Sequence, residues 1–296
     1  MFRTDQTTAV TALPVPAAAG TPGYFTGGNP ATGQAATILD ADWLNMVQEE
    51  LMNLLAAAGI PPSKTTYNQV LAAIQKVVTG QTSGRLLNVQ KFTSSGTYTP
   101  TPGTTSIVVE VLGGGGGGGG SAATSSTQAA VGGCGASGAY AKSRFTTGFA
   151  AGIAVTVGAA GVAGAAGSVG GTGGTTYFGS LVAAPGGTGG GGGIALAVSG
   201  GTGSGVCSAP NPPGNLVSYP GSSVMQSIII SSGVAFTAAG GSSMYGSGGI
   251  PSGVTGAGFS GSGYGAAGSG GVSLASAAAQ VGGAGSQGVA IVWEYA

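Results

Sequence analysis

The sequence predicts a mixed, mainly non-α protein: an extended N-terminal arm, a short α-helical hairpin, then a small β-sheet with a bundle of polyglycine II helices. Glycine supplies 65 of the 296 residues and proline 14, well above their usual shares. Disordered chains are also charged and hydrophilic, whereas here 5% of residues are charged and the mean hydropathy is +0.37, so we expect the glycines to be packed. Ten of the fourteen charged residues precede residue 92, and 57 of the glycines follow it, which predicts two modules.

Residues 1–40 are expected to form an extended arm. Pro14, Pro16, Pro22 and Pro30 lie among Gly, Thr and Ala, and proline disfavours helix both at its own position and at the one before it. Because this stretch has little apolar surface to bury, we expect it to become ordered on a partner.

Residues 41–80 are predicted to form a helical hairpin. Asp40 or Asp42 can cap the first helix, and Gly59, followed by the Pro61–Pro62 pair, ends it. Its apolar residues recur at spacings of three and four, as in an a/d seam. They are Leu44, Val47, Leu51, Leu54 and Ala58.

The second helix can be capped by Ser63, Thr65 or Thr66 and is expected to stop at Gly80. Its apolar stripe consists of Tyr67, Val70, Leu71, Ile74, Val77 and Val78. A lone hairpin has too little core to be stable, so we expect it to pack against symmetry copies, or alternatively against the second module of the same chain. The expected oligomer interface contains Trp43, Leu44, Val47, Leu51, Leu54 and Ile74, and residues 81–91 are expected to be a linker.

The second module, residues 92–296, contains several runs with the composition and alternation of β-strands. These runs are expected to form one small sheet that closes with the last strand. They are KFTSSGTYTP, TSIVVEVLG, GAYAKSRFTT, GIAVTVG, TTYFGSLVAA and the terminal GVAIVWEYA.

Glycine recurs with a period of three between these strands. It occupies positions 158, 161, 164, 167, 170 and 173, and shorter registers include 186, 189, 192 and 282, 285, 288. Three residues per turn is the period of the polyproline II conformation, in which one row of glycines allows close approach of neighbouring backbones. The all-glycine run 113–120 and the run 186–193 are expected at the centre of such a bundle.

Composition excludes several functional classes. There is no histidine, which removes the commonest general base and most zinc chemistry. Seven Lys and Arg residues balance seven Asp and Glu, so no basic surface is expected for nucleic acid. We therefore expect no enzyme activity, cofactor or metal. Neither a secretory signal nor a membrane span is recognisable, and Cys134 and Cys207 are too few for a disulfide scaffold.

The four charged residues of the second module all lie on predicted strands. Two interpretations are open: Glu110 and Glu294 could be a carboxylate pair for glycoside hydrolysis, or all four charges could form a structural cluster that ties three strands together. We favour the structural cluster, which contains Glu110, Lys142, Arg144 and Glu294.

The segment 206–236 interrupts the glycine periodicity, and insertions of this kind often carry binding residues. Single aromatic residues among Gly and Ser further along the chain suit an adaptable recognition surface. The alternative is that these side chains cap the ends of the bundle or pack on Ala and Gly. The candidate binding residues are Asn211, Asn215, Tyr219, Tyr245, Phe259 and Tyr264.

Two stretches resemble known proteins. TPGYFTGGNPATGQAATILDADWLNMVQEELMNLLAAAGI resembles the N-terminal region of tail-fibre proteins of tailed phages and prophages, which attaches the fibre to the virion and trimerises it. The second module, with GGGGGGGG, IAVTVGAAG and GVAIVWEY, looks like the glycine-rich domain at the ends of such fibres, and is similar to the distal adhesins of T-even-like phages. In those adhesins the domain is a separate small protein, whereas here it is fused to the attachment region.

The resemblance implies a phage tail fibre, located in the virion after assembly in the host cytoplasm. It implies a homotrimer that is attached to the tail or baseplate through its N-terminus, where Tyr24, Phe25 and Pro30 are the expected contacts. It also implies that loops at the free end of the glycine bundle bind an outer-membrane protein or a surface polysaccharide. The alternatives are a purely structural virion component, an ice-binding or cell-surface glycine-rich protein, and, last, a depolymerase.

Overall fold

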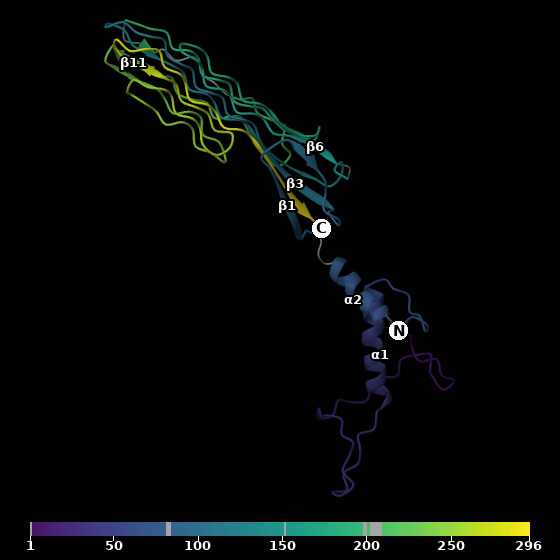
Figure 1. The fold of residues 1–296 in the computed structure, drawn as a ribbon. Helices are drawn as coiled ribbons and strands as arrows, with labels where there is room; N and C mark the ends of the chain where they lie inside the picture. Colours follow the sequence, from purple (N-terminus) through teal and green to yellow (C-terminus); the bar gives the residue numbers. More distant parts are fainter. Residues whose placement is uncertain (1, 81–83, 151, 198–199, 202–208) are drawn as a thin grey trace. The chain divides into compact units, whose positions relative to one another are not determined.

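The computed structural model describes residues 2–80, 84–150, 152–197, 200–201 and 209–296, and the chain divides into two compact units, Met1–Ser83 and Gly84–Ala296 (Figure 1). Among the described residues, two helices lie in the first unit and fourteen strands in the second, so the mixed, mainly non-α class is confirmed. None of the helices in the described part of the chain is long and apolar enough to cross a bilayer.

The first unit contains helices α1 (Ala41–Ala57) and α2 (Gln69–Gly80). The predicted cap is present: Asp40 Oδ1 accepts a hydrogen bond of 2.7 Å from the backbone N–H of Trp43. Gly59 follows the helix with a positive φ of 59°, a conformation that glycine adopts without steric cost. The small core between the helices contains Leu55, Ala58 and Ala73, with Leu54, Ile60, Val70 and Val77 packed around it.

The helix α2 begins later than the sequence indicated, because residues 63–66 form their own turn. The Ser63 hydroxyl is hydrogen-bonded to the hydroxyls of Thr65 and Thr66. The side chain of Gln69 accepts a hydrogen bond from Ser63 N and donates one to Pro61 O. Tyr67 therefore precedes the helix and is almost fully exposed.

In the second unit, two antiparallel sheets pack face to face, which corrects the expectation of one small sheet. The five-stranded sheet has the order β1-β14-β3-β5-β10, and the four-stranded sheet has the order β2-β6-β7-β8. The first is formed by β1 (Leu86–Phe92), β14 (Val289–Tyr295), β3 (Ser106–Leu112), β5 (Tyr140–Phe145) and β10 (Val217–Tyr219). The second is formed by β2 (Gly96–Tyr98), β6 (Ile153–Thr156), β7 (Thr176–Phe178) and β8 (Val182–Ala184).

The alternation of side chains explains why a second sheet is needed. Residues 107, 109 and 111 of β3 share one apolar face, which has to be covered. Tyr98, Phe178 and Val182 of the smaller sheet cover it. Strand β1 begins at Leu86, so it occupies most of the segment 81–91 that was expected to be a linker; residues 81–83 lie outside the described part.

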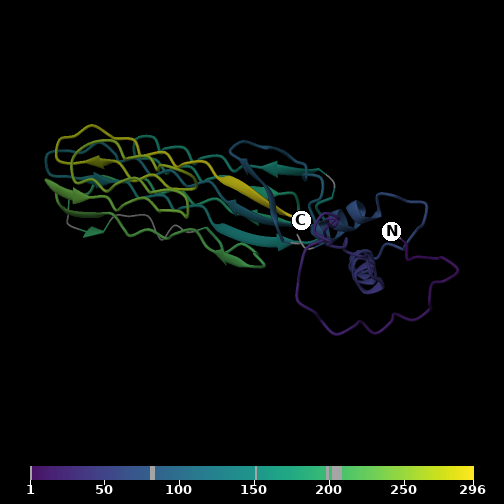
Figure 2. The ribbon, with the colours of Figure 1, turned by 90° about the horizontal axis from the view of Figure 1, so that it is seen from below.

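The run Gly113–Gly120 is at the centre of the bundle, as predicted. Successive N–H groups donate in turn to three antiparallel segments, and successive carbonyls accept from three parallel segments, all at 2.8–3.0 Å. The donor bonds of Gly114, Gly117 and Gly120, for example, reach Gly174, Gly171 and Ser168. Figure 2 shows these segments lying side by side along the unit. The six neighbours are 133–139, 168–174, 280–286, 161–164, 187–193 and 268–271.

Period-three glycine is explained by this packing, since each turn of a neighbour presents one residue to the centre. A Cβ built on Gly117 would lie 1.9 Å from Val162 O, and one on Gly170 would lie 2.1 Å from Gly117 O. The run 186–193 lies in the surrounding ring, which corrects the expectation that it is central. Its Gly187, Gly190 and Gly193 N–H groups donate to the centre at 2.8 Å. The register 158–173 is divided between two antiparallel helices by a turn at Gly167, whose φ is +64°.

Short strands lie at the end of the bundle away from the sheets, where β11 is labelled in Figure 1. One group is β4 (Ala130–Val131) with β13 (Val272–Ser273); the other is β9 (Gly200–Gly201), β11 (Ile228–Ser231) and β12 (Val234–Phe236). A second core of Val131, Ile229, Ala235 and Val272 lies beneath them. Cys134 is buried, and Cys207 lies outside the described residues.

Glu294 is fully buried at the other end of the unit. Its carboxylate accepts hydrogen bonds from the Thr101 hydroxyl at 2.5 Å, from Thr101 N at 3.2 Å and from Gln90 Nε2 at 3.0 Å. Burial raises the pKa of Glu294, but these hydrogen bonds outweigh burial and hold the pKa below its ordinary value. The carboxylate therefore joins β14 to the chain that follows β2.

We predict that Gly117→Ala destabilises the second unit, because the new methyl group must push apart two hydrogen-bonded backbones. Overpacking commonly lowers the unfolding free energy by about 1–3 kcal/mol, and we expect a loss at or above the top of this range. Such a loss corresponds to a fall in Tm of about 10 °C. The matched control is Gly256→Ala, where a Cβ would meet nothing within 4 Å. Thermal unfolding followed by Trp293 fluorescence, in a Trp43→Phe background, tests this. Equal Tm values for the two variants would contradict it.

A depressed folded-state pKa stabilises the protein above the unfolded pKa, and this contribution is lost as the pH falls through the folded value. We therefore predict that the unfolding free energy of the second unit decreases below about pH 4.5. The Glu294→Gln variant should show a weaker pH dependence, and its unfolding free energy at pH 7 should be about 1–3 kcal/mol lower. Glu110 is expected to supply the remaining dependence. Unfolding curves measured between pH 3 and 7 with the same Trp293 signal test this; parallel pH profiles for the two proteins would refute it.

Candidate functional site

The second unit has one end where its chain enters and leaves. The N–H of Gly84 donates to the carbonyl of Ala296 at 2.6 Å beside the sheets. The opposite end, which we call the tip, is built from the turns that connect the glycine helices (Figure 1). These turns are residues 122–129, 165–168, 194–197, 228–236, 253–255 and 274–279.

Hydrogen bonds and close contacts join the turns of the tip. Ala129 exchanges backbone hydrogen bonds with Leu196, and Ala275 N donates to Ser232 O at 2.7 Å. The Thr255 hydroxyl accepts from Leu274 N at 3.0 Å. Segments that are far apart in the sequence therefore form one surface.

The hairpin of β11 and β12 gives the tip an exposed apolar face. Ile228 pairs with Phe236, and Ile229 with Ala235, so alternate side chains point to opposite sides. Ile229 and Ala235 are buried in the core below. Four residues are exposed to between 41% and 52%: Ile228, Ile230, Val234 and Phe236.

The tip carries no charge. All four charged residues after residue 91 lie on β3, β5 and β14, in the five-stranded sheet. The tip therefore offers apolar side chains, hydroxyls, amides and backbone groups, which can bind a partner by burying surface and by neutral hydrogen bonds. Serine, threonine and glutamine of the turn 122–129 supply part of these polar groups.

The predicted tyrosines lie near the sheets. Tyr219 is the last residue of β10 and stacks on Tyr140 of β5, with ring centroids 5.0 Å apart. The Tyr245 hydroxyl donates to Glu110, and its pKa is raised by burial and by that carboxylate. Lys91 Nζ lies 4.6 Å from the centroid of the Tyr264 ring.

The other predicted binding residues are dispersed. Phe259 is half-exposed on an outer segment of the bundle. Asn211 is exposed. Asn215 extends the edge of β5, because its side chain accepts from Arg144 N at 2.7 Å and donates to Arg144 O at 2.8 Å.

The predicted charge cluster forms only in part. Lys142 Nζ is 2.9 Å from Glu110 Oε1, across two paired strands. Burial raises the pKa of Glu110, but the hydrogen bond from Tyr245 and the Lys142 ammonium outweigh it and hold the pKa below its usual range. On β14, the residue that pairs with Glu110 is Ile291. Glu294 is three residues further along, and because side chains alternate, it lies on the other face of the sheet. The two carboxylates do not form a pair suited to glycoside hydrolysis.

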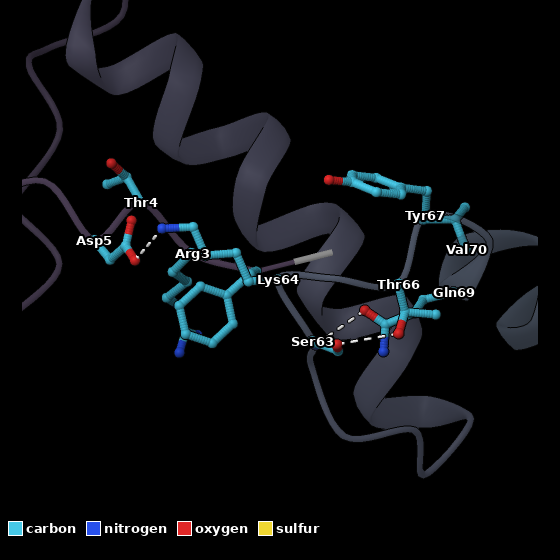
Figure 3. A pocket seen from close by; sticks show the side chains of 10 residues that line it. Arg3, Thr4, Asp5, Ser63, Lys64, Thr66, Tyr67, Gln69 and Val70 are labelled. Carbon is cyan, nitrogen blue, oxygen red and sulfur yellow. Dashed lines mark hydrogen bonds and ion pairs between the residues drawn. The ribbon is translucent and has the colours of Figure 1, made fainter.

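The expected attachment residues lie on the arm. Tyr24 is 99% exposed, Phe25 packs edge-on against Trp43 at 5.1 Å, and Pro30 is in a turn closed by Asn29 and Gln34. Arg3 pairs with Glu49 at 2.6 Å, and Asp5 pairs with Lys64 at 2.5 Å. Figure 3 shows these first arm residues beside the connection between the helices.

The predicted interface residues of the hairpin divide into two groups. Trp43, Leu44 and Ile74 are exposed, whereas Val47, Leu51 and Leu54 are half-buried. The helix α2 has two apolar stripes: residues 70, 73 and 77 face α1, and residues 71, 74 and 78 remain exposed.

Sequence reasoning selected the segment 206–236 but not the four exposed apolar residues of the tip within it, and it missed Tyr140. The signal for the apolar residues was IIISSGVAF, in which two short β-prone runs on either side of Ser-Gly predict a hairpin. Tyr140 had no local signal, because its partner Tyr219 is distant in the sequence and becomes its neighbour only through the pairing of β5 and β10.

Comparisons with known proteins found two relatives of short stretches. The Uncharacterized protein StfP of Escherichia coli K12 is 43% identical over 54 residues, 18% of this chain and 26% of that protein. The Mu-like prophage FluMu defective tail fiber protein of Haemophilus influenzae is 45% identical over 58 residues, 20% of this chain and 9% of that protein. The chain thus spans about a quarter of the first relative and a tenth of the second. Residues 92–294, which form the sheets and the bundle, match the glycine-rich domain family, and the chain belongs to this family.

Proposed function

We propose that the protein is a tail fibre of a tailed phage or prophage that binds a receptor on the bacterial surface through the tip. The N-terminal unit attaches it to the tail or baseplate and forms a homotrimer, so that the protein is part of the virion. The receptor is an outer-membrane protein or a surface polysaccharide. The protein carries out no chemical step and binds neither nucleic acid nor a cofactor.

The observation that carries the proposal is the exposed apolar face on a charge-free tip, opposite the end where the chain enters and leaves. Contiguous exposed apolar residues are unusual on a monomeric surface and mark interaction sites. The bundle beneath them is fixed by backbone hydrogen bonds in six directions, so the face is presented without a large loss of conformational entropy on binding.

Similarity to the Haemophilus protein, whose name describes a tail fibre, supports attachment to a virion. The arm fits such a role, since Tyr24 is exposed and the turn 29–34 projects a short hairpin. The second apolar stripe of α2 supports the oligomer, because Leu71, Ile74 and Val78 are too large to remain exposed at low cost when they are adjacent.

We predict that the labelled full-length chain binds selectively to strains of a Gram-negative panel and competes with phage adsorption. The Ile230→Ser variant is expected to bind at least tenfold more weakly, since truncating a hot-spot residue at the centre of an interface costs about 2 kcal/mol or more. The matched control is Val89→Ser, which changes a similarly exposed residue on β1 at the sheet end. If a folded, oligomeric sample fails to bind a strain that the phage infects, the protein is a structural virion component.

We predict that the full-length chain is a trimer, with a mass about three times the 27.5 kDa of one chain. The double variant Leu71→Asp/Ile74→Asp is expected to dissociate, because carboxylates in an apolar interface are strongly disfavoured. Gln75→Asp on the neighbouring face of the same helix should leave the mass unchanged. Light scattering after size-exclusion chromatography measures the mass, and a monomeric unmodified protein would contradict the trimer.

A further inference from the structure

We propose that the glycine-rich unit has a second binding site, for a neutral hexopyranose residue of a saccharide. It is a pocket between the β5–β10 edge and the turn 242–246. This site is at the sheet end of the unit and shares no residue with the tip, so the inference goes beyond the proposed function and holds whether or not the tip binds a receptor.

Strand pairing builds the aromatic wall of the pocket. Tyr219 and Tyr140 are direct partners in the antiparallel pair, so their side chains project from the same face and stack with an interplanar angle of 21°. Tyr140 covers one side of the Tyr219 ring, and Tyr219 remains 37% exposed. Tyr219 lines the pocket, so part of this exposed surface is available to a ligand.

A turn from a distant part of the sequence forms the opposite wall. The Tyr219 hydroxyl donates to Met244 Sδ at 3.5 Å. The ring centroids of Tyr245 and Tyr140 are 6.3 Å apart, with an angle of 72° between the ring planes. The hydrogen bond from Tyr245 to Glu110 holds this turn against the sheet. The pocket encloses about 310 Å³, within the range that small-molecule sites occupy.

The lining of the pocket combines the two features that a sugar ring requires. Tyr219 and Met244 are exposed to 37% and 50% and provide flat or deformable apolar surface for the C–H face of a pyranose, while the buried Tyr140 supports the Tyr219 ring. Ser222 and Ser242 provide hydroxyls. The Ser222 hydroxyl donates to Ser223 O at 3.4 Å and can accept a further hydrogen bond. Ser242 Oγ already accepts from Gly248 N at 3.1 Å, which fixes its position and leaves its hydrogen to donate.

The charges near the site indicate that the ligand is neutral. No charged residue lines the pocket. The nearby carboxylate of Glu110 is held by both Lys142 and Tyr245, so the ion pair is satisfied within the protein. A carboxylated or phosphorylated sugar would lose hydration there without gaining an ionic partner.

The test is saturation-transfer NMR on the full-length chain with four probes, the methyl glycosides of glucose, galactose, mannose and N-acetylglucosamine, and with methyl glucuronoside as a charged comparator. We expect saturable binding of at least one neutral glycoside and none of the glucuronoside. Tyr219→Ala should weaken binding at least tenfold, whereas Tyr219→Phe, which keeps the ring, should stay within about threefold. Tyr177→Ala, at a similarly exposed tyrosine on β7, is the matched control.

Met244→Ala provides a second test of the pocket in case Tyr219→Ala disturbs folding. Met244 is half-exposed, so its truncation removes little core. It should weaken binding while leaving the unfolding curve of Trp293 unchanged. The tip variant Ile230→Ser should bind the glycosides normally, which separates failure of this site from failure of the tip. The proposal is overturned if no neutral glycoside binds, or if binding is equal in Tyr219→Ala, Met244→Ala and the unmodified chain.

Discussion

Contact between backbones that no side chain separates is the interaction on which the glycine-rich unit depends. Gly113–Gly120 can donate to three neighbours and accept from three because each residue lacks a Cβ, and a methyl group at these positions would lie about 2 Å from a carbonyl oxygen. Ordering so much glycine costs more conformational entropy than ordering any other residue. Saturated hydrogen bonding at 2.8–3.0 Å offsets this cost, and the sheets and the tip are fixed to the two ends of the resulting rod.

The bundle could be predicted because the period of the glycines equals the period of the helix. The helical hairpin could be predicted for the same reason, with Asp40 as its cap. Alternation does not show which surface covers a strand, however, so the second sheet was missed. Periodicity also cannot show where a helix reverses: the register from Gly158 to Gly173 is continuous in sequence but turns back at Gly167.

The tip and the pocket beside β5 and β10 were harder to predict, because each brings together segments that are far apart in the sequence. The residues of the tip are separated by complete passes through the bundle, and only the fold brings Ser232 to Ala275. Tyr245 was predicted to belong to a binding surface, whereas in the structure its hydroxyl donates to Glu110 of β3. A buried carboxylate needs donors, and this requirement determines where the tyrosine lies.

The separation of charge from the tip also follows from the bundle. Its helices pack through backbone and small side chains, and a charge between them would be buried without a partner. The four charges are therefore confined to the sheets, where cross-strand pairs and buried hydroxyls satisfy Glu110 and Glu294. Each turn at the tip connects two helices whose positions are already fixed by backbone bonds, so a turn can change in length or sequence without shifting the glycine register. A bundle that is fixed by backbone hydrogen bonds and carries uncharged turns at one end allows binding specificity to change while the fold stays the same.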